Sequence, residues 1–118
     1  MRPKDAGTRW ETSLTRRLPE SWRLAEGGPA DAGDLAWRLP TGDVLIVEAK
    51  RRENLSVHAA LAKAKAKVRA ADLPFVPLAT ILIWDRPQLK PGKVRRSRAW
   101  EPVVVCGLDD FIGLMGGE

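Results

Sequence analysis

The residues best suited to chemistry are two acids and a lysine, namely Asp34, Glu48 and Lys50. Glu48 and Lys50 follow the apolar run Val44–Val47, and side chains alternate between the two faces of a strand, so these two point the same way. Paired carboxylates repel each other unless a cation compensates them. A hard divalent cation such as Mg²⁺ takes oxygen ligands, acidifies bound water and neutralises charge on a phosphate. A lysine beside it can orient that water.

Whether Asp34 joins this pair depends on the length of the turn that contains Thr41. A three-residue loop centred on Thr41 pairs Leu39 with Asp43 and sets Asp34 opposite Glu48, with Cβ atoms about 5 Å apart. A two-residue turn shifts the register by one residue and moves Asp34 to the other face. The sequence leaves both registers open.

The apolar periodicity predicts a single α/β domain over residues 1–118, with the element order α-β-β-α-β-β-α. We interpret residues 1–6 as a frayed start, after which a capping box at Thr8 opens a helix that ends near Arg17, before Pro19. The other expected elements are strands over 35–39, 44–50, 80–84 and 102–106, and helices over 56–71 and 111–115.

Glu11 allows two interpretations. As the third residue after Thr8 it fits the capping box, in which its side chain only caps the helix. It also lies at the edge of the apolar face formed by Trp10, Leu14 and Leu18, where it could supply a further acid to the site.

Positive charge is concentrated in one segment. The chain carries a net charge of +5, and residues 85–99 contain six basic residues against Asp85 alone. Such a segment favours a polyanion partner, most commonly nucleic acid, although a solvated loop is the alternative. Nearby, Trp100 could stack on a base. The basic residues are Arg86, Lys90, Lys93, Arg95, Arg96 and Arg98.

Two lysines of the predicted helix over 56–71, Lys63 and Lys67, share one face. They could meet phosphate, or they could only extend their stems along the protein surface. The sole cysteine, Cys106, and the sole histidine, His58, exclude an internal disulfide and a Cys/His zinc site. We expect Cys106 in the core and His58 on the surface.

The apolar runs are too short to span a membrane, and we see no secretion signal. We therefore expect a cytoplasmic protein with no membrane partner.

The sequence resembles the PD-(D/E)XK nucleases, the restriction-endonuclease-like superfamily. Within it, the chain is most similar to the small Holliday-junction resolvases of archaeal type and their phage-encoded relatives. The likeness is carried by Glu11, by Asp34, and by Glu48-Ala49-Lys50, and it spans roughly residues 7–115. One residue departs from the pattern, since Gly33 stands where the family motif has proline.

This resemblance implies a restriction-endonuclease-like fold, a central mixed sheet flanked by helices, and Mg²⁺-dependent hydrolysis of DNA in which Mn²⁺ substitutes. The products would carry a 5′ phosphate and a 3′ hydroxyl. Asp34, Glu48 and the carbonyl of Ala49 would hold the metal, Lys50 would position the attacking water, and Glu11 would act through metal or water. A homodimer is also implied, because two sites must nick paired strands of a four-way junction.

Three functions stay open from the sequence. The first is a junction-resolving endonuclease, and the second is a nuclease of the same fold that acts on flaps, ends or duplex DNA. The third is a catalytically silent DNA-binding module, against which the complete acid–acid–lysine set argues. Nothing in the sequence separates the first two.

Overall fold

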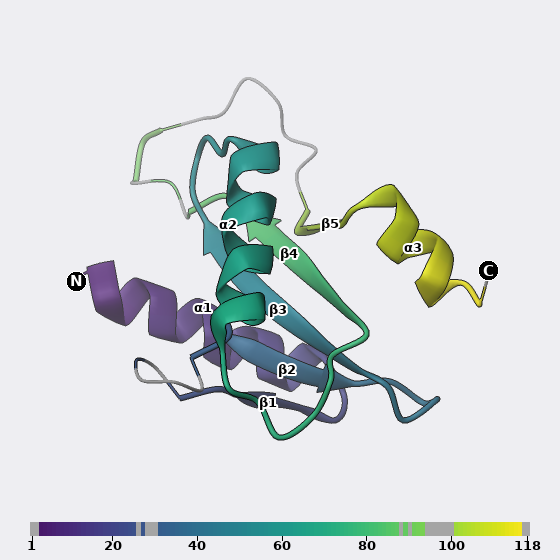
Figure 1. Ribbon diagram of the computed structural model, residues 1–118. Coiled ribbons are helices and arrows are strands. Elements are labelled where there is room, and N and C mark those ends of the chain that lie inside the picture. The colour runs from purple at the N-terminus through teal and green to yellow at the C-terminus, as the bar shows by residue number, and fades with distance from the viewer. Residues whose placement is uncertain are drawn as a thin grey trace.

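A five-stranded mixed sheet lies between helices (Figure 1). The computed structural model describes residues 3–25, 27, 31–87, 89, 91–93 and 101–116, and of residues 3–8 only the backbone. The mixed sheet and its flanking helices confirm the predicted α/β class. Among these residues no helix combines the length and the apolar character needed to cross a membrane.

The strands lie in the order β1-β2-β3-β4-β5, and all neighbours are antiparallel except β3 and β4. Because a parallel pair needs a crossover, α2 connects these two strands. The elements are α1 (Pro3–Arg17), β1 (Ser21–Arg23), β2 (Leu35–Arg38), β3 (Val44–Arg51), α2 (Val57–Ala70), β4 (Ala79–Asp85), β5 (Val103–Val105) and α3 (Leu108–Leu114).

Two expectations about the first quarter of the chain are wrong. Helix α1 begins at Pro3 and not at Thr8, so residues 3–6 are helical and the predicted capping box at Thr8 is wrong. The first two residues of the predicted frayed start lie outside the described residues. Proline suits a first turn because its missing N–H needs no partner there. The second error is the omission of β1, which makes the observed order α-β-β-β-α-β-β-α. A three-residue strand is too short to show a recognisable alternation of apolar and polar residues in the sequence. Its pairing with β2 holds it in place.

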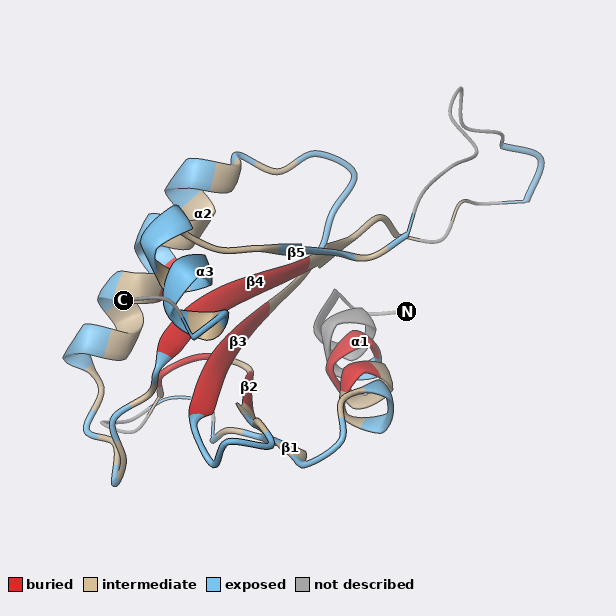
Figure 2. Ribbon diagram, turned by 90° about the vertical axis from the view of Figure 1, so that its right-hand side faces the viewer, coloured by how far each residue is buried: buried red, intermediate tan, exposed pale blue. Residues whose placement is uncertain are grey.

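The core has two layers, one on each face of the sheet (Figure 2). On one side Trp10 and Leu14 of α1, each 2% exposed, pack against Leu35 and Val47. On the other side α2 covers a smaller cluster centred on Ile46, which is fully buried. Strand β3 is thus buried on both faces, as its continuous apolar run predicts.

The β2–β3 hairpin has the register with the three-residue loop. The N–H of Leu39 donates to the carbonyl of Asp43 at 2.8 Å, and further along the ladder Leu35 pairs with Val47. This register sets Asp34, the residue before Leu35, beside Glu48. The expected loop centred on Thr41 is therefore confirmed.

Gly33 brings the chain close to β3 just before β2 begins. Its φ of +155° is rarely adopted by other residues, and a Cβ there would lie 2.8 Å from Cγ2 of Ile46 and 3.4 Å from Oε2 of Glu48. Proline, which fixes φ near −65°, could not adopt this conformation. A glycine at position 33 is thus required by this backbone, and it seats Asp34 against the hairpin.

We expect Gly33→Ala to lower the free energy of unfolding by about 3 kcal/mol, because it combines backbone strain with a clash against the buried Ile46. Gly42→Ala is the matched control, since Gly42 has φ +92° but open space around its Cα. The control should lose about 1 kcal/mol through backbone strain alone. Urea denaturation of both variants measures the difference, and equal losses would contradict the close approach at Gly33.

Candidate active site

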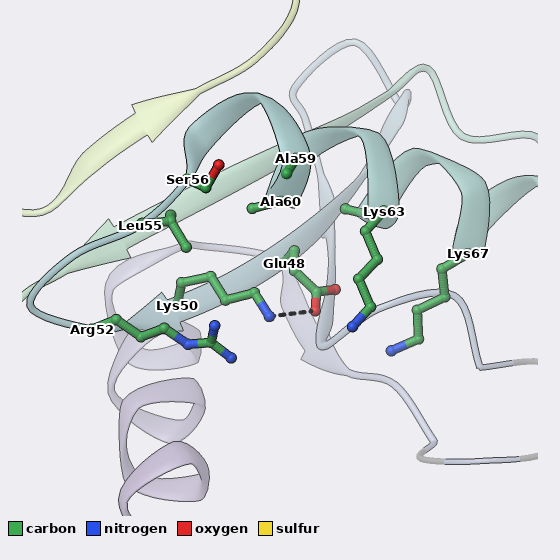
Figure 3. A pocket seen from close by; sticks show the side chains of 10 residues that line it. Glu48, Lys50, Arg52, Leu55, Ser56, Ala59, Ala60, Lys63 and Lys67 are labelled. Atoms are coloured by element: carbon green, nitrogen blue, oxygen red, sulfur yellow. Dashed lines mark ion pairs between the residues drawn. The ribbon is translucent and has the colours of Figure 1, made fainter.

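Glu48 and Lys50 come from the second half of β3 and lie on the face of the sheet covered by α2 (Figure 3). The Nζ of Lys50 is 3.5 Å from Oε1 of Glu48. Both side chains are largely buried, since that of Lys50 is 21% exposed and that of Glu48 is 12% exposed. Strand periodicity correctly predicts that they share a face.

Asp34 is fixed to the same hairpin by its main chain and its side chain. Its N–H donates to the carbonyl of Val47 at 3.1 Å. Its Oδ2 accepts a hydrogen bond of 2.7 Å from the N–H of Ala49. Because Ala49 lies between Glu48 and Lys50, this bond holds the aspartate beside both of them. The structure thus brings the three predicted residues together.

A cavity of about 410 Å³ separates this end of β3 from α2. Three alanines on α2 leave it open, and Figure 3 shows the side chains of Lys63 and Lys67 reaching from the helix toward the carboxylate of Glu48. The cavity therefore has the carboxylate of Glu48, with the ammonium of Lys50 beside it, on one wall and the ammonium groups of Lys63 and Lys67 on the other. The residues around it are Glu48, Lys50, Arg52, Leu55, Ser56, Ala59, Ala60, Lys63, Ala64 and Lys67.

Burial raises the pKa of Glu48 above its ordinary value of 4.5, and the charge of Asp34 raises it further. The ammonium groups of Lys50 and Lys67 oppose this shift without cancelling it. In addition, Oε2 of Glu48 is buried and has no hydrogen-bond partner among the described residues. A buried, unsatisfied carboxylate oxygen is costly, so the site has an unmet requirement for positive charge.

Asp31 contacts a residue of the pocket, and the sequence did not predict this. Its Oδ1 is 3.3 Å from Nζ of Lys67. Its Oδ2 accepts a 2.8 Å hydrogen bond from the N–H of Gly27. That bond, with the charge of Lys67, lowers the pKa of Asp31. The only signal was an acid within a glycine-rich loop close to Asp34, which is too common to single out.

Lys67 interacts both with Asp31 and with the pair formed by Asp34 and Glu48. Burial by itself lowers the pKa of its ammonium, but the carboxylates of Glu48, Asp31 and Asp34 outweigh burial and raise that pKa. Lys67 is therefore protonated at neutral pH. It partly offsets the three acids in the described site.

The residues present fit a hard divalent cation. Asp34 and Glu48 supply carboxylate oxygens, and Mg²⁺ commonly uses one or two carboxylates with water and phosphate oxygens as the other ligands. The N–H and the carbonyl of Ala49 both point toward the β2 side of β3. Ala49 lies beyond Val47, the last residue of β3 that pairs with β2 in the described ladder. In the described part of the chain no group of three or more His, Cys, Asp or Glu side chains is placed to hold one metal ion, so the fit rests on two carboxylates.

Glu11 lies on the opposite face of the sheet. It is buried, and its Oε2 is 2.8 Å from the guanidinium of Arg23. Arg23 pairs with Leu35, whose side chain belongs to the core under α1. The helix-cap interpretation is wrong, because Glu11 sits well inside a helix that begins at Pro3. Its predicted catalytic role stays a prediction.

The predicted DNA-binding residues are only partly described. Lys63 and Lys67 belong to the pocket, Lys93 is exposed, and Nε of Arg86 lies 3.8 Å from Glu53. The remaining ones, together with Trp100, lie outside the described residues: Lys90, Arg95, Arg96 and Arg98. Among the other expectations, His58 is exposed, and Cys106 packs against the core from a half-buried position.

Comparison of the chain with protein-family models, with curated proteins and with solved structures gives no match. The functional argument therefore depends on the residues and the geometry of this site.

The electrostatics of Glu48 predict a pH-dependent stability effect. A carboxyl whose pKa is raised by folding stabilises the fold below its unfolded pKa and loses that contribution as pH rises through the folded pKa. In EDTA, Glu48→Gln should therefore be more stable than the wild type at pH 7, and the gain should vanish as pH falls below about 4.5.

Urea denaturation across that pH range measures the effect. The exposed Glu101 provides a control, since Glu101→Gln should stay within about 0.5 kcal/mol of the wild type throughout. A Glu48→Gln protein that is less stable than the wild type at pH 7 would contradict the electrostatic assignment.

Proposed function

We propose that this chain is a metal-dependent endonuclease that hydrolyses phosphodiester bonds in DNA, and that its substrate is the four-way junction. One observation carries the proposal. Asp34 and Glu48 lie side by side on the β2–β3 hairpin, and Glu48 and Lys50 line a pocket whose opposite wall carries Lys63 and Lys67. The choice of junctions over other DNA follows from the sequence resemblance and is the finer part of the proposal.

Asp34, Glu48 and the carbonyl of Ala49 would hold the metal. When bound, Mg²⁺ supplies a water of lowered pKa and neutralises charge on the phosphate. Two features of the protein support this assignment: Oε2 of Glu48 has no hydrogen-bond partner among the described residues, and the pKa of that carboxyl is raised. Both describe a negative site that a divalent cation would relieve.

The other residues of the pocket have roles that follow from their positions. Lys50, 3.5 Å from Glu48, can donate a hydrogen bond to a water or to a phosphate oxygen at the edge of the carboxylates. Lys63 and Lys67 can hold the non-bridging oxygens of the same phosphate from the α2 side. The water oxygen then bonds to phosphorus, the bond to the 3′ oxygen breaks, and the proton lost by water is recovered on that oxygen. The products are a 5′ phosphate and a 3′ hydroxyl.

The proposal includes a homodimer, because paired nicks in a junction need two sites. Helix α3 offers an apolar surface of the kind that dimer contacts use. Its ion pair between Asp110 and Lys65, at 2.8 Å, joins it to α2, while its outer side chains face solvent. We assign this surface to contact with a second copy. The exposed apolar residues are Leu108, Phe111, Ile112 and Met115.

The purified protein should nick four-way DNA junctions symmetrically in Mg²⁺ or Mn²⁺ and should be inactive in EDTA. Asp34→Asn removes a metal ligand and Lys50→Ala removes the group that orients water, so each should lower the cleavage rate by at least about a thousandfold. Junction binding should change little in either variant. Gel-based cleavage with end-labelled strands and binding measured in EDTA test both statements.

Arg69→Ala is the control for these variants, since Arg69 is an exposed residue of α2 that does not line the pocket. Its cleavage rate should stay within about threefold of the wild type. Cleavage that survives both Asp34→Asn and Lys50→Ala would overturn the site. Equal rates on junctions and linear duplexes would instead identify a nuclease of broader substrate range.

A further inference from the structure

A second basic surface lies on the outer face of α1, away from the active-site pocket. Arg9, Arg16 and Arg17 line a hollow of about 460 Å³ together with the half-buried Thr12 and Ser13. The spacing places all five side chains on one face of the helix. The opposite face carries the buried Trp10 and Leu14 (Figure 2). We refer to the first face as the α1 arginine face.

The charge of the α1 arginine face is not offset by the described acids. All three arginines are exposed, and none takes part in the ion pairs that link described residues. The described acid within α1, Glu11, is buried and engaged with Arg23. Arg16 and Arg17 lie in the last turn of α1, where positive charge is favourable for the helix dipole. This does not account for Arg9 or for the hollow that the three arginines share, whereas an anionic ligand accounts for both.

The chemistry of this face suits phosphodiesters. Guanidinium groups bind phosphate oxygens through paired hydrogen bonds, and hydroxyl side chains are frequent second donors to a nucleic-acid backbone. Arg9 and Arg16 are about 10 Å apart along the helix axis. Phosphates of one DNA strand advance about 3.4 Å along the duplex axis, so the face can reach several of them.

The position of the face decides which part of the substrate it can meet. The pocket with Glu48 lies on the α2 side of the sheet, and α1 covers the other side (Figure 2). DNA that contacts both must therefore pass from one side of the sheet to the other. A straight duplex has to bend to do so, which costs deformation energy, whereas a branched DNA already has arms that leave in different directions.

We propose that the α1 arginine face is a separate phosphate-backbone site that holds a duplex arm other than the one in the pocket. This inference rests on the proposed function and extends it, because it gives the chain a reason to prefer branched over linear DNA. Binding at the face is sequence-independent, since only phosphates are contacted.

The test compares Arg16→Gln/Arg17→Gln with the matched control Arg38→Gln/Arg69→Gln, which removes the same charge from exposed arginines elsewhere. Fluorescence anisotropy in EDTA measures affinity for a four-way junction and for a linear duplex built from two of its arms, so no DNA is cut. The α1 variant should lose at least about tenfold in junction affinity but less than about threefold for the duplex. Its salt slope on the junction should fall by about 2.

The control variant should weaken binding to both DNAs by the same factor. An α1 variant that behaves like the control, or a wild type without preference for the junction, would overturn the inference. Circular dichroism confirms that the variants fold. A wild type that binds junctions through the α1 arginine face but leaves them uncut in Mg²⁺ would overturn the proposed function and still support this site.

Discussion

Repulsion between two carboxylates held side by side is the constraint on which the site depends. The hairpin register sets Asp34 beside Glu48, and the N–H of Ala49 fixes the aspartate in that place. In water the two charges would separate, but here backbone pairing prevents it. The surrounding cations limit the repulsion: Lys50 from the same strand, and Lys67 from α2. Burial and the remaining repulsion together raise the pKa of Glu48, and its buried Oε2 has no hydrogen-bond partner among the described residues.

Two carboxylates held side by side lower the stability of the fold. Apolar or neutral residues at these positions would be more favourable for β3, since the run Val44–Val47 before them is buried and apolar. Gly33 shows a related compromise, because its strained backbone brings the loop against Ile46 and seats Asp34. Stability given up at a concentrated set of polar residues is typical of functional sites. The rest of the fold compensates through the core that α1 builds on the other face of the sheet.

Much of this could be read from the sequence where burial and periodicity agree. The run Val44–Val47 predicts a central strand, and strand alternation then fixes the shared face of the residues that follow it. The position of Asp34 needed the turn length, which local composition does not determine. Thr8 misled because a capping pattern is a local signal, which does not exclude that the helix begins further back, at Pro3. Asp31 and the three-residue strand β1 owe their positions to tertiary contacts, which leave no periodic signal.

Divalent-cation binding without DNA tests the central claim most directly, because it needs no assumption about the substrate. Titration of Mn²⁺ followed by electron paramagnetic resonance measures the free ion in the presence of the protein. The wild type should bind Mn²⁺ in competition with Mg²⁺, and Asp34→Asn and Glu48→Gln should each weaken binding by about tenfold or more. Equal Mn²⁺ binding by the wild type and both variants would contradict the account, since the paired carboxylates would then hold no metal.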